Sequence, residues 1–342
     1  MDNVTTLDAL FQGKVGGSVA ERLLANNMDT SCLRQSRTNK EGILVNANAA
    51  LRYDEWKAFD EEVLKITTSR LVGANDLISR GLVKNLPNGL GTTILQYEME
   101  SDMTAAEVHM DAISRGVKDR PEYTIGYLPL PVVHKDFSIN ARALAASRKT
   151  GEPLDTAAAS IAARLVAEKV ETILFQGLSS YTFGGGVIYG YHDFDKTNTV
   201  AVTAHWNDSA ASGATILADV LRMKAASISD KHYGPWGLYV PTTWEAALDG
   251  NYSSTYPQTV RDRLLAIGGI EFVHVADKQV ADHATLVELQ AGTARMVIGL
   301  QPQLVQWDSE GGMGLNFKLM CIMVPQLRAD QDGNCGIVVA TL

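Results

Sequence analysis

One long helical segment, residues 155–176, constrains the fold of this 342-residue chain more than any other stretch. Apolar side chains recur along it at spacings of three and four residues, and charged side chains fill most other positions, which predicts an amphipathic helix with one buried face. At 1.5 Å per residue the helix spans roughly 30 Å, enough to cross a domain. Asp155 is the expected N-cap and Gly177 the expected left-handed stop. We predict that the core of this helix is formed by Ile161, Leu165, Val166, Val170, Ile173 and Leu174.

The charge distribution argues against a general nucleic-acid binder, because phosphate contacts need clustered Lys and Arg. The chain has a formal net charge of -9 and contains no basic run. Its three cysteines, Cys32, Cys321 and Cys335, are far apart and lack metal-ligand spacing, which predicts free thiols in a reducing compartment. The N-terminal residues lack a signal-peptide pattern, and no apolar run approaches the length of a membrane span. We therefore expect a cytoplasmic protein with no membrane partner.

A long polar stretch between two strand-like segments predicts a projecting hairpin. Residues 92–99 and 123–133 have the β-branched and aromatic content of strands, and the residues between them are dense in charge. A loop of this length is functional or disordered, and the flanking strands favour a hairpin that reaches away from the body. Glu98, Glu100 and Asp102 alternate and so share one strand face. Such carboxylates can perform acid–base chemistry, but a face turned to solvent or to a partner is the favoured interpretation.

The rest of the chain predicts a mixture of helices and strands. Residues 1–50 are polar and rich in small side chains, which is typical of an arm that becomes ordered on a partner. Residues 52–71 predict an amphipathic helix, and a connection rich in Gly, Asn and Pro follows it to residue 91. Alternating helices and strands over residues 205–300 indicate a compact α/β subdomain. We also expect a short helix at 137–147, helices at 213–229, 243–249 and 256–267, and strands at 236–241, 271–276, 285–290, 294–300, 303–307, 315–325 and 336–341.

Two patterns invite a chemical interpretation, and neither is specific. The run Gly184–Gly186 lacks the Lys-Ser/Thr pair of a phosphate loop, and no helix start follows it, so a tight turn is favoured. The seven histidines lack the spacing of a helical zinc site, although His192 lies near Asp193 and Asp195. A soluble α/β enzyme with a site near His192 therefore stays open as an alternative. The sequence predicts no catalytic residue, metal or cofactor, and this favours a structural protein over an enzyme.

Three segments of the chain carry a family resemblance. They are LPLPVVHKDFSINARALAASRKTGEPLDTAAASIAARLVAEKVETILFQG (128–177), LRYDEWKAFDEEVLKITTSRL (51–71) and MVIGLQPQLVQWDSEGGMGLNFKLMCIMVPQL (296–327). The chain resembles the major capsid proteins of tailed phages, which have the Hong Kong 97-type fold, and in particular the encapsulin-related branch. The resemblance covers nearly the whole chain from about residue 51 onward, and it rests on structural segments with no catalytic signature.

The resemblance implies an α+β capsid fold, in which the axial domain sits at five-fold and six-fold axes. The implied division is an N-terminal arm (1–50), a helix and connection of the peripheral domain (51–91), an extended loop and its base (92–133), the peripheral domain (134–204) with its spine helix (155–176), the axial domain (205–300) and C-terminal strands of the peripheral domain (301–342). The extended-loop residues expected at an assembly interface are Glu98, Glu100, Asp102, Arg115, Lys118 and Arg120.

The resemblance also implies a function. A protein of this kind self-assembles as pentamers and hexamers into the icosahedral shell that encloses the double-stranded DNA of a tailed phage, without sequence-specific DNA binding. Portal, scaffolding and cement proteins are the expected partners, and the expected locations are the virion capsid and, during assembly, the bacterial cytoplasm. The long polar N-terminal portion favours a phage capsid, and an encapsulin-type nanocompartment shell is the alternative. Some family members cross-link a loop lysine to a neighbour's asparagine, for which Lys118 and either Asn316 or Asn334 are the candidates.

Overall fold

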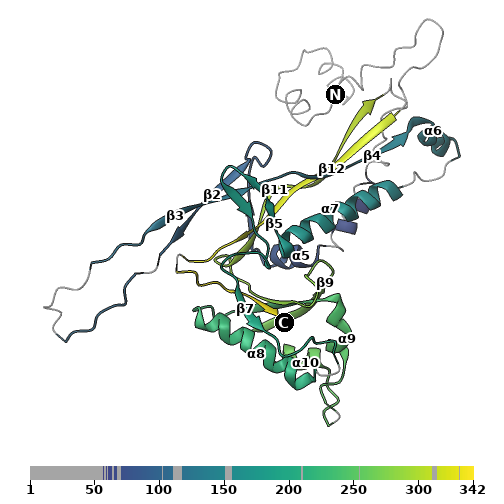
Figure 1. Ribbon diagram of the computed structural model, residues 1–342. Helices are drawn as coiled ribbons and strands as arrows, with labels where there is room; N and C mark the ends of the chain where they lie inside the picture. Colours follow the sequence, from purple (N-terminus) through teal and green to yellow (C-terminus); the bar gives the residue numbers. More distant parts are fainter. Residues whose placement is uncertain are drawn as a thin grey trace, which may run out of the picture. The chain divides into compact units, whose positions relative to one another are not determined.

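The computed structural model (Figure 1) describes residues 57, 59, 61–63, 65–67, 71–101, 103–110, 118–150, 156–208, 211–253, 255–309, 314–330 and 332–342. The chain forms two compact units, and the larger comprises Phe59–Phe137, Thr156–Val305 and Lys318–Leu342. The predicted arm at residues 1–50 lies outside the described residues. In the described part of the chain, no helix combines the length and the apolar character needed to cross a membrane.

Helices and strands are mixed along the chain, which confirms the predicted α+β class. The helices are α5 (Val72–Ser79), α6 (Ala141–Thr150), α7 (Ala157–Gln176), α8 (Gly213–Ser229), α9 (Glu245–Asp249) and α10 (Val260–Leu265), with a 3-10 turn η1 (Thr242–Trp244). The strands are β1 (Val83–Asn85), β2 (Ile94–Glu100), β3 (Tyr123–Pro129), β4 (Val133–Asn140), β5 (Leu178–Phe183), β6 (Gly186–Ile188), β7 (Asn198–Ala201), β8 (Trp236–Pro241), β9 (Ile270–Ala276), β10 (Ala284–Glu288), β11 (Ala294–Ser309), β12 (Gly314–Leu327) and β13 (Ile337–Thr341).

The long helix α7 packs on a four-stranded sheet whose strand order is β1-β11-β12-β4. Ile173 of the helix shares one apolar core with Val297 of β11 and Ile322 of β12. The helix ends as the sequence predicts, because Gly177 adopts a φ of 75° that glycine tolerates without steric cost. Thr156 occupies the N-cap position, and the predicted cap, Asp155, lies outside the described residues.

Two predicted core positions of α7 are wrong. Val166, Val170, Ile173 and Leu174 are buried, but Ile161 is 51% exposed and Leu165 is 38% exposed. These two residues are one turn apart and therefore lie on the same side of the helix. The buried stripe near the start of the helix is instead made of alanines, whose small side chains let the helix approach its neighbours closely: Ala159, Ala162, Ala163 and Ala167.

Helix α5 was expected to be part of a connection, and this expectation is also wrong. Its first turn packs against α7 so tightly that a Cβ on Gly73 would lie 2.8 Å from Leu174 Cδ2. The backbone N–H groups of Gly73 and Ala74 donate to the buried carboxylate of Glu171 in α7, at 3.3 and 3.0 Å. The helix therefore depends on a distant residue that accepts from its otherwise unpaired first N–H groups. In the sequence, Gly73 had instead favoured a connection without a helix.

A five-stranded sheet with the order β7-β13-β10-β8-β9 forms the second core of the larger unit. Helix α8 contributes Ile216, Val220 and Met223 to this core, which also includes Trp206 and Trp244. The observed α8 and β8 have the predicted bounds. The C-terminal strand β13 was expected among the strands of the peripheral domain, but it pairs with β10 and β7 in this sheet.

Three other expected boundaries differ from the structure. Strand β4 takes the first residues of the expected short helix, so α6 starts only at Ala141. The two strands expected at 294–300 and 303–307 form one continuous strand, β11. The expected helix at 256–267 is the shorter α10. In β4 and β11, pairing with a neighbouring strand overrides the local preference of the sequence.

Candidate functional site

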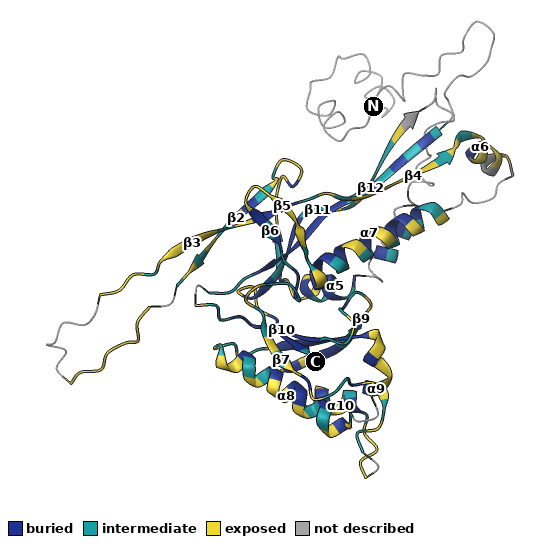
Figure 2. Ribbon diagram, in the orientation of Figure 1, coloured by how far each residue is buried: buried dark blue, intermediate teal, exposed yellow. Residues whose placement is uncertain are grey.

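The most prominent candidate site is the two-stranded hairpin of β2 and β3, in which the strands pair along their whole length from Ile94↔Pro129 to Glu100↔Tyr123. At its base, Leu95 and Leu128 are buried in the core under the four-stranded sheet. Beyond the base, yellow residues mark exposed positions on both strands (Figure 2). The predicted hairpin is therefore present, and its base is anchored in the core.

One face of the hairpin combines carboxylates with large apolar side chains. Glu98 lies opposite Ile125, and Glu100 lies opposite Tyr123, and directly opposed residues of an antiparallel pair point to the same face. Ile125 is 53% exposed and Tyr123 is 60% exposed. A solvent-exposed strand face with large apolar residues beside charges is typical of a surface that a partner covers.

The carboxylate of Asp119 stabilises the loop beyond the strands through hydrogen bonds to the backbone. Thr104 N and Arg120 N donate to the two carboxylate oxygens of Asp119, at 2.9 and 2.8 Å. These backbone hydrogen bonds lower the pKa of Asp119. The apolar side chains of Val108 and Met110 in this loop point fully into solvent. No described residue of the chain covers these two side chains.

Four of the six predicted interface residues lie among the described residues. Glu98 and Glu100 share the exposed face as predicted. Lys118 and Arg120 lie in the outer loop and are exposed. Asp102 and Arg115 lie outside the described residues. A role of these six residues in assembly stays a prediction.

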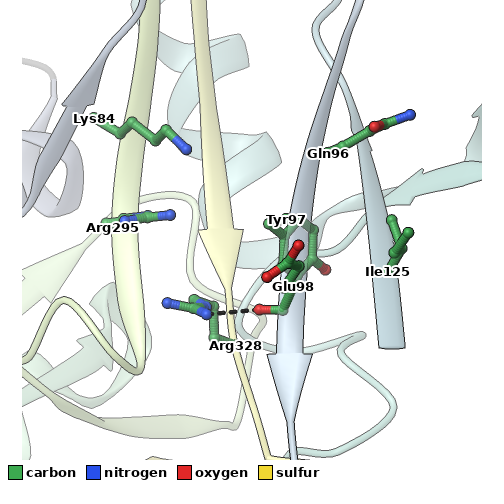
Figure 3. A pocket seen from close by; sticks show the side chains of 7 residues that line it. All are labelled: Lys84, Gln96, Tyr97, Glu98, Ile125, Arg295 and Arg328. Atoms are coloured by element: carbon green, nitrogen blue, oxygen red, sulfur yellow. Dashed lines mark hydrogen bonds between the residues drawn. The ribbon is translucent and has the colours of Figure 1, made fainter. Parts of the chain in front are cut away.

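A groove of about 460 Å³ lies at the base of the hairpin, and Figure 3 shows the side chains that line it. Its cations are Lys84 of β1, Arg295 of β11 and Arg328, which follows β12; the other lining residues are Gln96, Tyr97, Glu98 and Ile125. Lys84 lies opposite Val297 in the parallel pair of β1 and β11, so Arg295, two residues before Val297, belongs to the same face. Arg328 Nη2 donates to the backbone oxygen of Glu98 at 2.8 Å.

The three cations of the groove repel one another. Burial lowers the pKa of Lys84, and the guanidinium groups of Arg295 and Arg328 lower it further. Burial and Arg328 likewise lower the pKa of Arg295. Among the described residues, none of the three cations has a carboxylate oxygen within 4.0 Å. Sequence reasoning missed this groove because strand pairing brings together residues that are more than 200 positions apart, and no local pattern marks them.

The region around His192 is built as a structural turn. Asp193 Oδ1 accepts from Gly190 N at 2.7 Å, and the same carboxylate lies against Gly177. Gly184 and Gly185 form the turn between β5 and β6 at positive φ, which confirms the predicted tight turn. Among the described residues, no group of three or more His, Cys, Asp or Glu side chains is placed to hold a metal ion.

Comparisons with known proteins agree with this architecture. A model described as "Family of unknown function (DUF6260)" matches residues 46–340. The chain is 27% identical over 137 residues to the type 1 encapsulin shell protein EncA of Myxococcus xanthus (strain DK1622). That match covers 39% of this chain and 45% of EncA, so the chain spans less than half the length of this curated relative.

Solved structures show the fold. The virus-like particle from Pyrococcus furiosus matches with a TM-score of 0.61 at 13% identity, over 84% of this chain and 98% of that one. The capsid of Myoviridae phage XM1 matches with a TM-score of 0.57 at 12% identity, over 77% and 90%. The capsid of an empty GTA particle matches with a TM-score of 0.54 at 12% identity, over 75% and 86%. The chain therefore has the Hong Kong 97-type capsid fold, as its sequence predicts.

Proposed function

We propose a function for this chain from the premise that it belongs to the DUF6260 family, whose model matches residues 46–340, and has a capsid-type fold. The chain is a shell subunit that assembles with copies of itself into a closed particle. One observation carries this proposal: the fold of viral capsid and virus-like-particle proteins extends over most of the chain. The exposed hairpin adds support, because its apolar face is left uncovered in a single copy.

Assembly accounts for the hairpin in physical terms. Among the described strands, β2 and β3 pair only with each other, and an isolated two-stranded hairpin is marginally stable in water. Burying Tyr123 and Ile125 against a neighbour removes apolar area from water at roughly 25 cal/mol per Å². In a symmetric shell every copy both gives and receives this contact, so the same surface is used many times.

Two candidate functions differ in what the shell would enclose. The favoured one is the major capsid protein of a tailed phage, in which pentamers and hexamers enclose double-stranded DNA and cooperate with portal, scaffolding and cement proteins. This protein would be assembled in the bacterial cytoplasm and end in the virion. The second candidate is an encapsulin-type nanocompartment shell, and the similarity to EncA favours it. Both are structural roles without catalysis.

Sedimentation and electron microscopy of the purified chain test the shared proposal. Round particles in the megadalton range are the expected result, and a discrete monomer or dimer under assembly-permissive conditions contradicts it. Particles purified from the natural source and treated with nuclease separate the two candidates. Protected genome-length DNA supports the phage capsid, whereas a protein cargo without DNA supports the nanocompartment.

The role of the hairpin has its own test. Residues 101–122 are replaced by Asn-Gly, which favours a tight two-residue turn between the paired residues Glu100 and Tyr123. Because residues 103–110 and 118–120 of the removed segment are exposed, we expect an unchanged thermal unfolding midpoint together with loss of particles. A variant that keeps the length but scrambles the order of residues 103–110 is the matched control for loop length. Normal particle yield from the shortened hairpin would contradict its role in assembly.

A further inference from the structure

The groove at the hairpin base brings together three cations, Lys84, Arg295 and Arg328, and one carboxylate, that of Glu98. The three cations are partly buried, and among the described residues none has a carboxylate oxygen within 4.0 Å. Arg295 Nε donates to the neutral amide oxygen of Gln326 at 2.7 Å, and Arg328 donates to a backbone carbonyl. Three partly buried cations outnumber the single carboxylate of the groove, and a further anion that enters the groove relieves both the repulsion and the desolvation.

A second observation beside the groove also points to a missing acceptor. The side chain of Gln326 is 1% exposed, and its oxygen is used by Arg295. Its amide nitrogen has no hydrogen-bond partner among the described residues. A buried donor of this kind is normally satisfied. A buried N–H donor without a partner therefore lies next to Arg295, one of the cations of the groove.

The chain itself contains a matching anionic segment in its hairpin. Residues 98–122 contain seven acidic and three basic side chains. The described acidic residues Glu100 and Glu107 are exposed. The rest of the chain offers no basic run that would suit a nucleic acid, and the net charge of -9 opposes one.

A hairpin cannot supply its own groove with its outer acidic residues. The groove is lined by Gln96, Tyr97, Glu98 and Ile125. Beyond these residues the paired strands end at Glu100 and Tyr123, and the loop continues from there away from the sheets (Figure 1). Glu107 is nine residues beyond Glu98, which is up to roughly 30 Å of extended chain at 3.3 Å per residue. A second copy meets no such restriction, since its hairpin can arrive from outside.

We infer that the groove of Lys84, Arg295 and Arg328 is the receiving site for carboxylates from the hairpin of a second copy of this chain. The inference rests on the proposed self-assembly and names the surface that guides it. Charge-assisted hydrogen bonds from the three cations hold the incoming carboxylates and fix the position of the hairpin along the neighbour. The exposed apolar residues Tyr123 and Ile125 of the incoming hairpin then add buried area.

A charge-swap experiment on the full-length chain tests this inference. The groove variant carries Lys84→Glu and Arg328→Glu, the hairpin variant carries Glu100→Lys and Glu107→Lys, and a third variant carries all four changes. Since like charges brought together cost several kcal/mol, we expect each double variant to form roughly tenfold fewer particles or less than the unmodified chain. The fourfold variant restores opposite charges at every contact and recovers particle formation. Lys196→Glu, the reversal of an exposed cation that pairs with Asp195, is the matched control and leaves the yield unchanged.

The outcomes distinguish failure of the proposed shell function from failure of the receiving site alone. If the unmodified chain forms no particles, the proposed function fails and the receiving site falls with it. If the unmodified chain forms particles and the groove variant forms them equally well, only the receiving site is refuted. Lack of recovery in the fourfold variant, or a groove variant that assembles normally but retains less DNA, also overturns it and points to another anion.

A neutral variant keeps the test decisive if Lys84→Glu with Arg328→Glu does not fold, as judged by circular dichroism. In Lys84→Gln with Arg328→Gln the attraction disappears without new repulsion. Particle formation by the unmodified chain should weaken between 50 and 500 mM NaCl, because salt screens charge pairs. At low salt the neutral variant should form fewer particles than the unmodified chain, and its particle formation should change less as the salt concentration rises. An unchanged salt dependence refutes the inference.

Discussion

Glu171 makes the stability of this subunit depend on pH. This carboxyl group sits in the middle of α7, where it is 3% exposed and accepts from the first N–H groups of α5. Its pKa is raised from 4.5 to about 7, chiefly by burial and in smaller part by the nearby Asp76 and Asp277, although the two backbone hydrogen bonds act in the opposite direction. The group therefore takes up a proton on folding at mildly acidic pH.

The sign and size of the effect follow from these two pKa values. Between 4.5, where the unfolded chain titrates, and about 7, where the folded chain titrates, the folded state binds more protons. Stability therefore decreases as pH rises through this window. At about 1.36 kcal/mol per pH unit, the whole window corresponds to about 3 kcal/mol. Glu171→Gln carries a neutral amide at every pH and escapes this loss.

Urea unfolding of unassembled subunits between pH 4.5 and 8, followed by tryptophan fluorescence, measures the effect. We expect Glu171→Gln to match the unmodified chain near pH 4.5 and to exceed its unfolding free energy by about 3 kcal/mol at pH 8. Taking the difference between the two chains cancels other titrating groups, such as His232, whose pKa is raised by its hydrogen bond to Glu288.

The matched control for this experiment is Glu168→Gln, on the same helix. Burial opposes ionisation of Glu168, but Lys278 and Arg164 outweigh burial and lower its pKa. Its contribution to stability is therefore present above the unfolded pKa and is lost as pH falls. Removing it should destabilise the chain at neutral pH, the opposite direction to Glu171→Gln. Parallel pH profiles for Glu171→Gln and the unmodified chain would refute the reasoning about burial.

Two further substitutions probe the cores of the larger unit through the same urea assay. Asp219 is fully buried and accepts from Trp206 Nε1 at 3.1 Å. Asp219→Ala leaves this buried donor unpaired, whereas Arg222 keeps its hydrogen bond to Thr203 Oγ1. We expect a loss of about 2 kcal/mol and a smaller loss for Asp219→Asn. Gly177 has a φ of 75° and a ψ of -172°, and a Cβ added there would meet the carboxylate of Asp193. Gly177→Ala should therefore lower the free energy of unfolding by about 2 kcal/mol or more. An unchanged free energy of unfolding would show that the turn after α7 can rearrange.

Local sequence patterns correctly predicted a helix or strand where that element buries one of its own faces. The spacing of apolar residues identified α7 and α8, and Gly177 marked the end of α7 because few other residues adopt a positive φ. The two strand-like segments that flank a charged stretch identified the hairpin of β2 and β3. Each of these inferences depends on residues that are close together in the chain.

Local patterns failed where a distant residue decides the structure. The sequence predicted apolar burial for Ile161 and Leu165, but which face of α7 meets the sheet is set by packing against β11 and β12. Helix α5 exists because Glu171, about a hundred residues away, accepts from its first N–H groups. The long-range pairing of β13 with β10 and β7 was also beyond local reasoning.

The sequence by itself determined the long helix, the acidic hairpin and the resemblance to capsid proteins, because each is carried by neighbouring residues with a regular spacing. Only the tertiary structure decided which hairpin residues are exposed and which cations meet at its base. Lys84, Arg295 and Arg328 come from three separate regions, and strand pairing places them at one groove. The charge of a single residue is written in the sequence, whereas the repulsion among three of them depends on distances that only folding creates.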